Sequence, residues 1–185
     1  MDKIPVANIL ADFQRMEREH WKYSSDTALG QVDCSGAFVW SYKQHGLSIY
    51  HGSNRIARRY VLDLVPYANA KAQGLIVPGI AAFKTRRPGD PKYALPSSYR
   101  KGGAYYNGDL LDYYHIGLVD EDTGYVLNAQ GTATGFVRSP ITQNWSHVAL
   151  LKDVAYDGEL PEADTVTITL SKALAEELLR ALSRA

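Results

Sequence analysis

The sequence predicts an α+β domain in which helices come first and antiparallel strands follow. In residues 4–20, apolar side chains recur at the three- and four-residue spacing of an amphipathic helix. From residue 75 onwards, short apolar runs bounded by Gly, Pro, Asn and Asp replace that spacing, and this pattern is typical of strands. The length of 185 residues and a hydrophobic fraction of 45% fit one domain with a substantial core. The apolar residues of the first helix are Ile9, Leu10, Phe13 and Met16.

Two further helices are expected before the strands. The second begins at Cys34 or Ser35, and it runs to His45 because Gly46 is well placed to end it. A third, shorter helix is expected over residues 54–64. Residues 84–112 are rich in Gly, Pro, Ser and Tyr, and they are interpreted as an irregular insertion. The expected strands cover residues 80–83, 114–119, 124–129, 135–138 and 147–151.

Composition excludes several classes of protein. Lys plus Arg and Asp plus Glu each number 20, so the chain lacks the basic excess of a nucleic-acid binder. The single cysteine, Cys34, excludes an internal disulfide and a cysteine-rich zinc site, and no metal or other cofactor is expected. No apolar run is long enough to span a membrane, and the N-terminus lacks the pattern of a secretory signal. Synthesis in the cytoplasm, with release or export by another route, is therefore expected.

Cys34 lies in Asp33-Cys34-Ser35-Gly36, where a loop enters the second helix. Unpaired N–H groups and the positive end of the helix dipole favour a thiolate there, so we expect a lowered pKa for the thiol. The same N–H groups can receive charge that develops on an attacked carbonyl oxygen. A free cysteine is more often a small buried hydrophobic residue, and that interpretation stays open.

A nucleophilic cysteine needs a base, and His115 is the candidate among the five histidines. A strand holds its imidazole rigidly, whereas His51 is expected in an exposed or loop position. If residues 120–123 form the turn, residue 119 pairs with 124, and His115 then lies opposite Asn128. Asn128 would orient the imidazole, and Gln130 on the same face is the alternative.

At these residues the chain resembles the NlpC/p60 family of bacterial cell-wall cysteine peptidases, a papain-like group. The resemblance covers roughly residues 5–150. It is carried by Trp21-Lys22-Tyr23, by the segment from Asp33 to Val39, by His115-Ile116-Gly117 and by a polar residue on the next strand. It implies a papain-like core in which the N-terminal helices pack on an antiparallel sheet, with an insertion before the histidine strand.

The resemblance also implies roles for six residues. Cys34 is then the nucleophile, His115 the base and Asn128 the third member of the triad. Tyr23 shapes the site beside the thiol, and Asp33 and Ser35 recognise the free N-terminal amine of a peptidoglycan stem peptide. The implied reaction is hydrolysis between D-γ-glutamate and a diamino acid. A bacterial or phage origin, as an endolysin, would fit a wall hydrolase without a signal.

The chain departs from the family pattern in two places. The family commonly has Gly-Asp on the strand before the histidine, where this chain has Gly79-Ile80. The insertion is the second departure, because it borders the expected groove and leaves the substrate preference open. Residues 84–101 contain six basic side chains and a single acidic one, Asp90. This charge either steers the chain towards an anionic wall polymer or belongs to a solvated loop.

Other functions remain open. A cell-wall amidase or an acyltransferase can use the same Cys-His pair, and a non-catalytic wall-binding or phage structural protein can carry a silent site. The expected peptidase domain covers residues 1–152. Residues 153–185 are expected to form an acidic linker, a strand and a helix with a leucine stripe that fits packing on the core or self-association.

Overall fold

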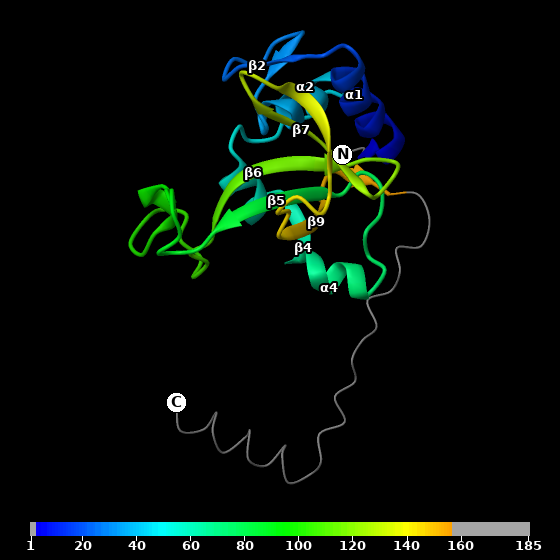
Figure 1. The fold of residues 1–185 in the computed structure, drawn as a ribbon. Helices are drawn as coiled ribbons and strands as arrows, with labels where there is room; N and C mark the ends of the chain where they lie inside the picture. The colour runs from blue at the N-terminus through cyan, green and yellow to red at the C-terminus, as the bar shows by residue number, and fades with distance from the viewer. Residues whose placement is uncertain (1–2, 157–185) are drawn as a thin grey trace, which may run out of the picture.

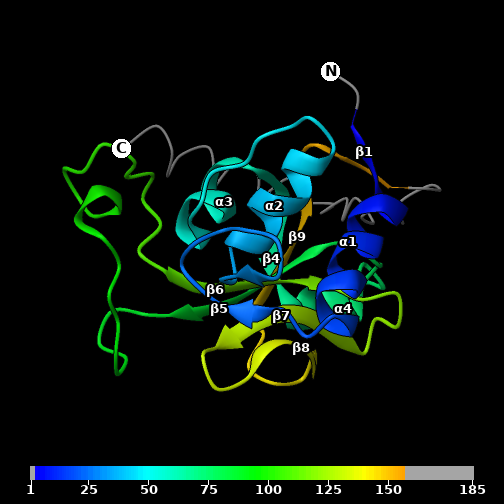
Figure 2. The ribbon, with the colours of Figure 1, turned by 90° about the horizontal axis from the view of Figure 1, so that it is seen from above.

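The computed structural model describes residues 3–156. Its centre is a six-stranded antiparallel sheet in the order β4-β9-β5-β6-β7-β8 (Figure 1). Seen from above, α1, α2 and α3 lie over this sheet (Figure 2). The elements are β1 (Ile4–Pro5), α1 (Val6–Arg18), β2 (Lys22–Tyr23), β3 (Gln31–Val32), α2 (Gly36–Gln44), α3 (Ser53–Arg59), β4 (Val61–Pro66), α4 (Tyr67–Ala72), β5 (Ala81–Arg86), η1 (Ser97–Tyr99), β6 (Asp112–Val119), β7 (Tyr125–Gly131), β8 (Gly135–Pro140), β9 (His147–Leu151) and β10 (Val154–Ala155).

The first helix forms as its sequence predicts. All four expected apolar residues of α1 are buried. Phe13 packs edge-on against Phe38 of α2, with 4.8 Å between ring centroids, and also against Phe136 of β8. Each large side chain buried in this way contributes about 1.5–3 kcal/mol. This packing fixes α1 and α2 against each other and against the sheet, so the first turn of α2 is held on a rigid frame.

The sheet has an apolar core on each side. The larger core joins α1, α2 and α3 to the sheet and includes Ile116 and Leu118 of β6. The smaller core includes Ala70 of α4, Val119 and Trp145. Figure 1 shows α4 on the side of the sheet away from α1 and α2. The predicted α+β class, with the N-terminal helices packed on an antiparallel sheet, is confirmed.

The predicted third helix is wrong in its second half. Helix α3 ends at Arg59, and Val61–Pro66 form strand β4. Strand β4 pairs with β9 at the sheet edge, with Val61 opposite Leu151. Pro66 cannot continue a helix, and pairing with β9 fixes the short apolar run before it as an edge strand.

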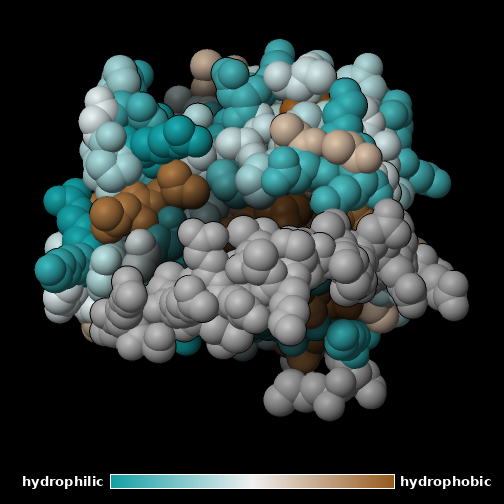
Figure 3. Space-filling view, turned by 90° about the horizontal axis from the view of Figure 1, so that it is seen from below, coloured by the Kyte–Doolittle hydropathy of each residue, from teal (hydrophilic) through white to brown (hydrophobic). Residues whose placement is uncertain are grey.

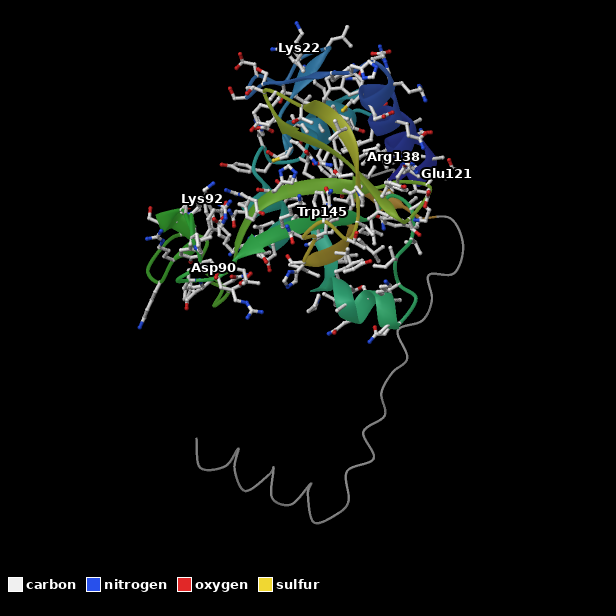
Figure 4. All side chains as sticks on the ribbon, in the orientation of Figure 1. Lys22, Asp90, Lys92, Glu121, Arg138 and Trp145 are labelled. Atoms are coloured by element: carbon white, nitrogen blue, oxygen red, sulfur yellow. The ribbon has the colours of Figure 1, made fainter. Side chains whose placement is uncertain are left out.

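The expected insertion is an irregular segment of residues 87–111 between β5 and β6, with the short η1 as its only regular element within the described chain. It projects from the end of the sheet (Figures 1 and 2). Figure 4 places the labelled Asp90 and Lys92 on this projection, far from Glu121 and Arg138 at the other end of the sheet.

The predicted domain boundary after residue 152 falls next to β10, which pairs in parallel with β1. The predicted tail strand and helix lie outside the described residues. Beside β10, a cavity of about 320 Å³ is bordered by Lys3, Leu62, Leu150 and Tyr156 among others, and it contains none of the expected site residues. The view from below shows hydrophobic side chains between the hydrophilic ones on this face (Figure 3). Among residues 3–156, no helix has the length and apolar character needed to cross a bilayer.

Candidate active site

Cys34 lies in the turn that leads into α2, two residues before Gly36, so the second helix begins slightly later than the predicted start at Cys34 or Ser35. The N–H of Ala37 donates to the carbonyl of Asp33 at 3.1 Å, so helical hydrogen bonding already begins at Asp33. The Asp33 side chain caps this turn by accepting from the N–H of Gly36 at 2.6 Å. A Cβ atom at Gly36 would lie 2.5 Å from Thr27 Oγ1, so a side chain here would require Thr27 to shift.

The thiol of Cys34 is a neutral group in the resting protein. Backbone N–H groups of Ile116, Ser35 and Cys34 itself hydrogen-bond with the sulfur and lower the pKa. Burial acts more strongly in the opposite direction, and with the neighbouring Asp33 charge it raises the pKa to about 12. The predicted lowering of the thiol pKa is therefore wrong, because the helix-start N–H groups do not outweigh desolvation. The bond from Ile116 places the thiol beside the residue that follows His115.

The second functional group is His115 on β6. Its Nε2 atom lies 2.9 Å from Oδ1 of Asn128. The Nδ2 atom of Asn128 donates to Ser139 Oγ at 2.6 Å and to the carbonyl of Val126 at 3.1 Å, which fixes the orientation of the amide. Because Oδ1 can only accept, Nε2 of His115 must carry the proton. The Nδ1 atom therefore holds the lone pair that a general base needs.

The predicted pairing of His115 with Asn128 is wrong in register and right in contact. Strands β6 and β7 pair Leu118 with Leu127 and Val119 with Val126. Continued along the strands, this register puts Asn128 opposite Gly117. Between the two alternatives named from the sequence, it is Asn128 that contacts the ring, since Gln130 donates to Ser139 Oγ at 2.9 Å.

Gly117 opens the space for this contact. A Cβ atom on Gly117 would lie 2.9 Å from Asn128 Cβ and 2.5 Å from Val126 Cγ1, closer than atoms approach in folded proteins. The missing side chain lets the Asn128 amide reach diagonally across the strands to His115. Gly117 belongs to the site, although its role was not predicted.

The imidazole of His115 lies in an aromatic environment. Its ring centroid is 5.4 Å from that of Trp145, which Figure 4 shows beside β6. The ammonium of Lys84 lies over the same indole, 4.7 Å from its centroid. Burial lowers the pKa of His115; the Asn128 bond raises it, and the charge on Lys84 lowers it further. The histidine is therefore a neutral base at neutral pH.

Asp33 has a partner that sequence reasoning missed. The Nε2 atom of His51 lies 2.9 Å from Oδ1 and 3.0 Å from Oδ2 of Asp33. His51 is exposed, as expected, yet it stands next to the thiol through this contact. No local pattern in the sequence indicates the contact, because the chain between Gly36 and His51 is spanned by α2 and a loop. His45 differs from His51, because it pairs with Asp12 at the far end of α2.

Tyr23 and Ser35 both lie near Cys34, with different degrees of exposure. Tyr23 on β2 is half-buried, and burial together with the charges of Cys34 and Asp33 raises the pKa of its hydroxyl. Ser35 is only 4% exposed, and its hydroxyl donates to Asp33 Oδ1 at 3.2 Å. Among the described residues, no three His, Cys, Asp or Glu side chains are grouped to hold a metal ion.

Solved structures of other proteins resemble this chain in fold. The NlpC/p60 domain of the peptidoglycan hydrolase SagA has 16% sequence identity and a TM-score of 0.51, and the match covers 78% of this chain and 97% of that domain. NlpC1 from Trichomonas vaginalis has 13% identity and a TM-score of 0.55, with 80% of this chain covered. NlpC2 from the same organism has 13% identity and a TM-score of 0.50, with 78% of this chain covered.

The fold is therefore of the papain-like α+β class. Within that class it is the NlpC/p60 fold, as the resemblance implies. The chain spans nearly the whole SagA domain but only 44% and 46% of the two Trichomonas proteins. No family profile matches the sequence. No curated protein matches it either.

Proposed function

We propose that the protein is a cysteine peptidase that hydrolyses peptidoglycan stem peptides, with Cys34 as nucleophile, His115 as base and Asn128 as the residue that orients the base. The observation that carries the proposal is the 2.9 Å bond between His115 Nε2 and Asn128 Oδ1, on the strand whose next residue, Ile116, influences the Cys34 thiol. The fold supports it, since SagA is a peptidoglycan hydrolase with the same fold.

The resting pair is neutral, so proton transfer accompanies attack. The Cys34 sulfur adds to the amide carbon while its proton passes to Nδ1 of His115. The N–H groups of Cys34 and Ser35, which lower the pKa of the thiol, can stabilise the negative charge on the carbonyl oxygen. His115 returns its proton to the leaving amine as the C–N bond breaks. Water then attacks the thioester, gives a proton to His115, and releases the acid and the thiol.

Asn128 keeps the imidazole productive. Its neutral amide oxygen accepts a hydrogen bond from the Nε2–H group and so orients the imidazole. A carboxylate in this place would also raise the pKa of the imidazole strongly. Ser139 and the carbonyl of Val126 prevent the amide from rotating. The histidine therefore offers the same nitrogen to the thiol at every turnover.

We propose Tyr23 as a wall of the site next to the thiol. The resemblance assigns amine recognition to Asp33 and Ser35, and here it needs a rearrangement. Asp33 already accepts from Gly36, Ser35 and His51, so a substrate ammonium must displace His51 to reach the carboxylate. Ser35 is buried, and its role is to stabilise the start of the helix. Asp33 is thus the candidate for amine recognition, with His51 as its exchangeable partner.

The bond that is cleaved decides among the enzymatic functions. Purified peptidoglycan is incubated with wild type, Cys34→Ala and His115→Ala, and the released muropeptides are analysed by mass spectrometry. Hydrolysis at D-γ-glutamyl bonds leaves free diamino-acid amines, whereas an amidase leaves free lactyl carboxylates. An acyltransferase joins the acyl fragment to an added amine in place of water. We expect the first pattern from wild type and none from either variant; undiminished cleavage by Cys34→Ala would sink the assignment.

A second candidate is a non-catalytic wall-binding protein, including a phage structural component. The raised pKa of Cys34 favours it, since a neutral thiol is a weak nucleophile by itself. Sedimentation with insoluble peptidoglycan separates the two functions in the same samples. Equal sedimentation of wild type and Cys34→Ala without any released muropeptide would establish this second function.

A further inference from the structure

Helix α3 carries two arginines one turn apart, and each guanidinium lies between tyrosine rings. Arg55 is 4.5 Å from the ring centroid of Tyr50 and 4.1 Å from that of Tyr105. Arg58 lies 4.9 Å from Tyr99 and 5.1 Å from Tyr113 in the same manner. Despite this similarity, the two cations differ in what their N–H groups contact.

Arg58 is a structural cation. Its side chain is only 2% exposed. It donates to the carbonyls of Asn54, Asp109 and Leu111, and it lies 3.6 Å from the Asp109 carboxylate. Asp109 and Leu111 belong to the end of the insertion. Arg58 therefore fastens the insertion to α3, and both of its terminal nitrogens donate to backbone carbonyls, while its Nε atom has no partner among residues 3–156.

Arg55 has no such partners. It takes part in none of the ion pairs found within residues 3–156. Its Nε atom is buried without a hydrogen-bond partner in that part of the chain. The largest influence on the guanidinium is a side-chain hydrogen bond with Tyr105, which raises the pKa of Arg55 and leaves its other terminal donors for a ligand. A guanidinium has five donors in one plane, and rings stacked on its faces leave the in-plane donors available.

The tyrosines around Arg55 come from two sides. Tyr50 belongs to the connection between α2 and α3, and its ring packs on Gly52, where a Cβ would lie 3.1 Å away. Tyr105 belongs to the insertion, and its N–H donates to the carbonyl of Ser98 at 2.8 Å. The cation is thus held in place before any ligand arrives. Such preorganisation lowers the entropic cost of binding.

We call Arg55 with Tyr50 and Tyr105 the clamp, and it lies next to the candidate active site. Tyr50 precedes His51, whose imidazole contacts Asp33 at 2.9 Å, and Asp33 precedes the nucleophile Cys34. Tyr50 is 45% exposed, so solvent reaches the clamp. In the view of Figure 2, α3 is drawn next to α2, which begins two residues after Cys34, and the insertion extends to one side. Tyr50, His51, Asp33 and Cys34 therefore form a continuous series of neighbours from the clamp to the thiol.

We propose that Arg55, held between Tyr50 and Tyr105, binds a free carboxylate of the peptide substrate. The proposal rests on the proposed function, because the substrate must lie at Cys34. A carboxylate matches the planar fork of arginine through two parallel hydrogen bonds. It also gives the insertion a function: Tyr105 completes the clamp, so the insertion takes part in substrate choice beyond any effect of its overall charge.

The test measures binding apart from cleavage. A stem peptide and analogues in which one carboxylate at a time is amidated are titrated calorimetrically into Cys34→Ala protein. We expect one amidation to weaken binding at least ~10-fold, and Arg55→Gln to weaken binding of the unmodified peptide equally while removing the effect of that amidation. Arg55→Lys keeps the charge but loses the fork, so it should recover only part of the affinity.

The control is Arg59→Gln, which removes an exposed cation from the same helix and should leave every affinity unchanged. Thermal unfolding of each variant checks that the insertion stays folded. Equal affinities with and without the Arg55→Gln substitution across all analogues, with unchanged melting, would overturn the carboxylate site. Absence of cleavage by wild type would overturn the proposed function but not the binding result, so the two failures are distinguishable.

Discussion

His115 Nε2 and Asn128 Oδ1 lie 2.9 Å apart, although the two residues are not opposite each other in the pairing of β6 with β7. The contact runs diagonally past Gly117, the one residue on this path without a side chain. The strand register, the glycine and the fixed amide of Asn128 together determine which nitrogen of His115 carries the proton. Three features that are separate in the sequence thus orient His115 and make it a base.

Gly117→Ala tests this geometry. The added methyl would approach Asn128 Cβ to 2.9 Å and the carbonyl of Leu127 to the same distance, so β7 must shift. We expect a loss of about 1–3 kcal/mol in the free energy of unfolding, as for other overpacked sites. Because the shift also lengthens the His115–Asn128 bond, kcat/KM for a stem peptide should fall by at least ~10-fold.

Gly124→Ala is the matched control in the same hairpin. Its added methyl would meet only the flexible Asp122 side chain, at 3.2 Å. Stability and kcat/KM should stay near the wild-type values. Equal effects of the two substitutions in urea unfolding would show that the hairpin tolerates a methyl group at either place, which is incompatible with a special role for Gly117.

Asn128→Asp should move the acid limb of the pH–rate profile. In the wild type, burial lowers the pKa of His115, so the imidazole stays neutral and active to a pH below the ordinary value for histidine. A carboxylate in place of the Asn128 amide favours the imidazolium and raises that pKa. The acid limb of kcat/KM should therefore shift upwards by about one pH unit.

Gln130→Glu serves as the comparison for this shift. It places a charge two residues further along β7, on a side chain that contacts Ser139 and does not contact the imidazole. Its acid limb should lie close to that of wild type. An unshifted limb in Asn128→Asp, measured over the same pH range, would remove Asn128 as the residue that controls the base.

Alkylation of Cys34 should be slow at neutral pH and should accelerate as the pH rises. Burial raises the pKa of this thiol to about 12, so the thiolate is a minor species well above neutrality. Iodoacetamide labelling followed by mass spectrometry gives the rate at each pH, and a free thiol peptide serves as the reference. A fast rate that is constant from acid to neutral pH would reveal a thiolate–imidazolium pair instead.

The elements that depend on local pattern were predictable. The apolar spacing of α1 and the glycine that ends α2 are local features, and the structure confirms both. The bond from the Gly36 N–H to Asp33 is also local, and it places Cys34 in the turn just before α2. The third helix failed after Arg59, because a short apolar run has no strong preference between helix and edge strand until β9 pairs with it.

Features that depend on tertiary packing were not predictable. The register of β6 and β7 differs from the simple four-residue turn, since the N–H of Asp120 bonds to the carbonyl of Tyr125. The contact of His51 with Asp33 follows from how a loop returns to the helix start. The thiol pKa has the opposite sign from the helix-start expectation, because desolvation depends on every element that packs around the sulfur.

Arg58→Gln should loosen the insertion while the rest of the fold persists. The guanidinium donates to two carbonyls near the end of the insertion, at 3.1 Å to Asp109 and at 2.8 Å to Leu111. Losing hydrogen bonds from a buried charged donor costs about 1.5–3 kcal/mol each. We expect limited proteolysis to cut within residues 87–111 much faster than in wild type, whereas Arg59→Gln should be cut at the wild-type rate. If amide exchange of the insertion is unchanged in Arg58→Gln, the tyrosines alone hold the segment and the anchoring role of Arg58 is refuted.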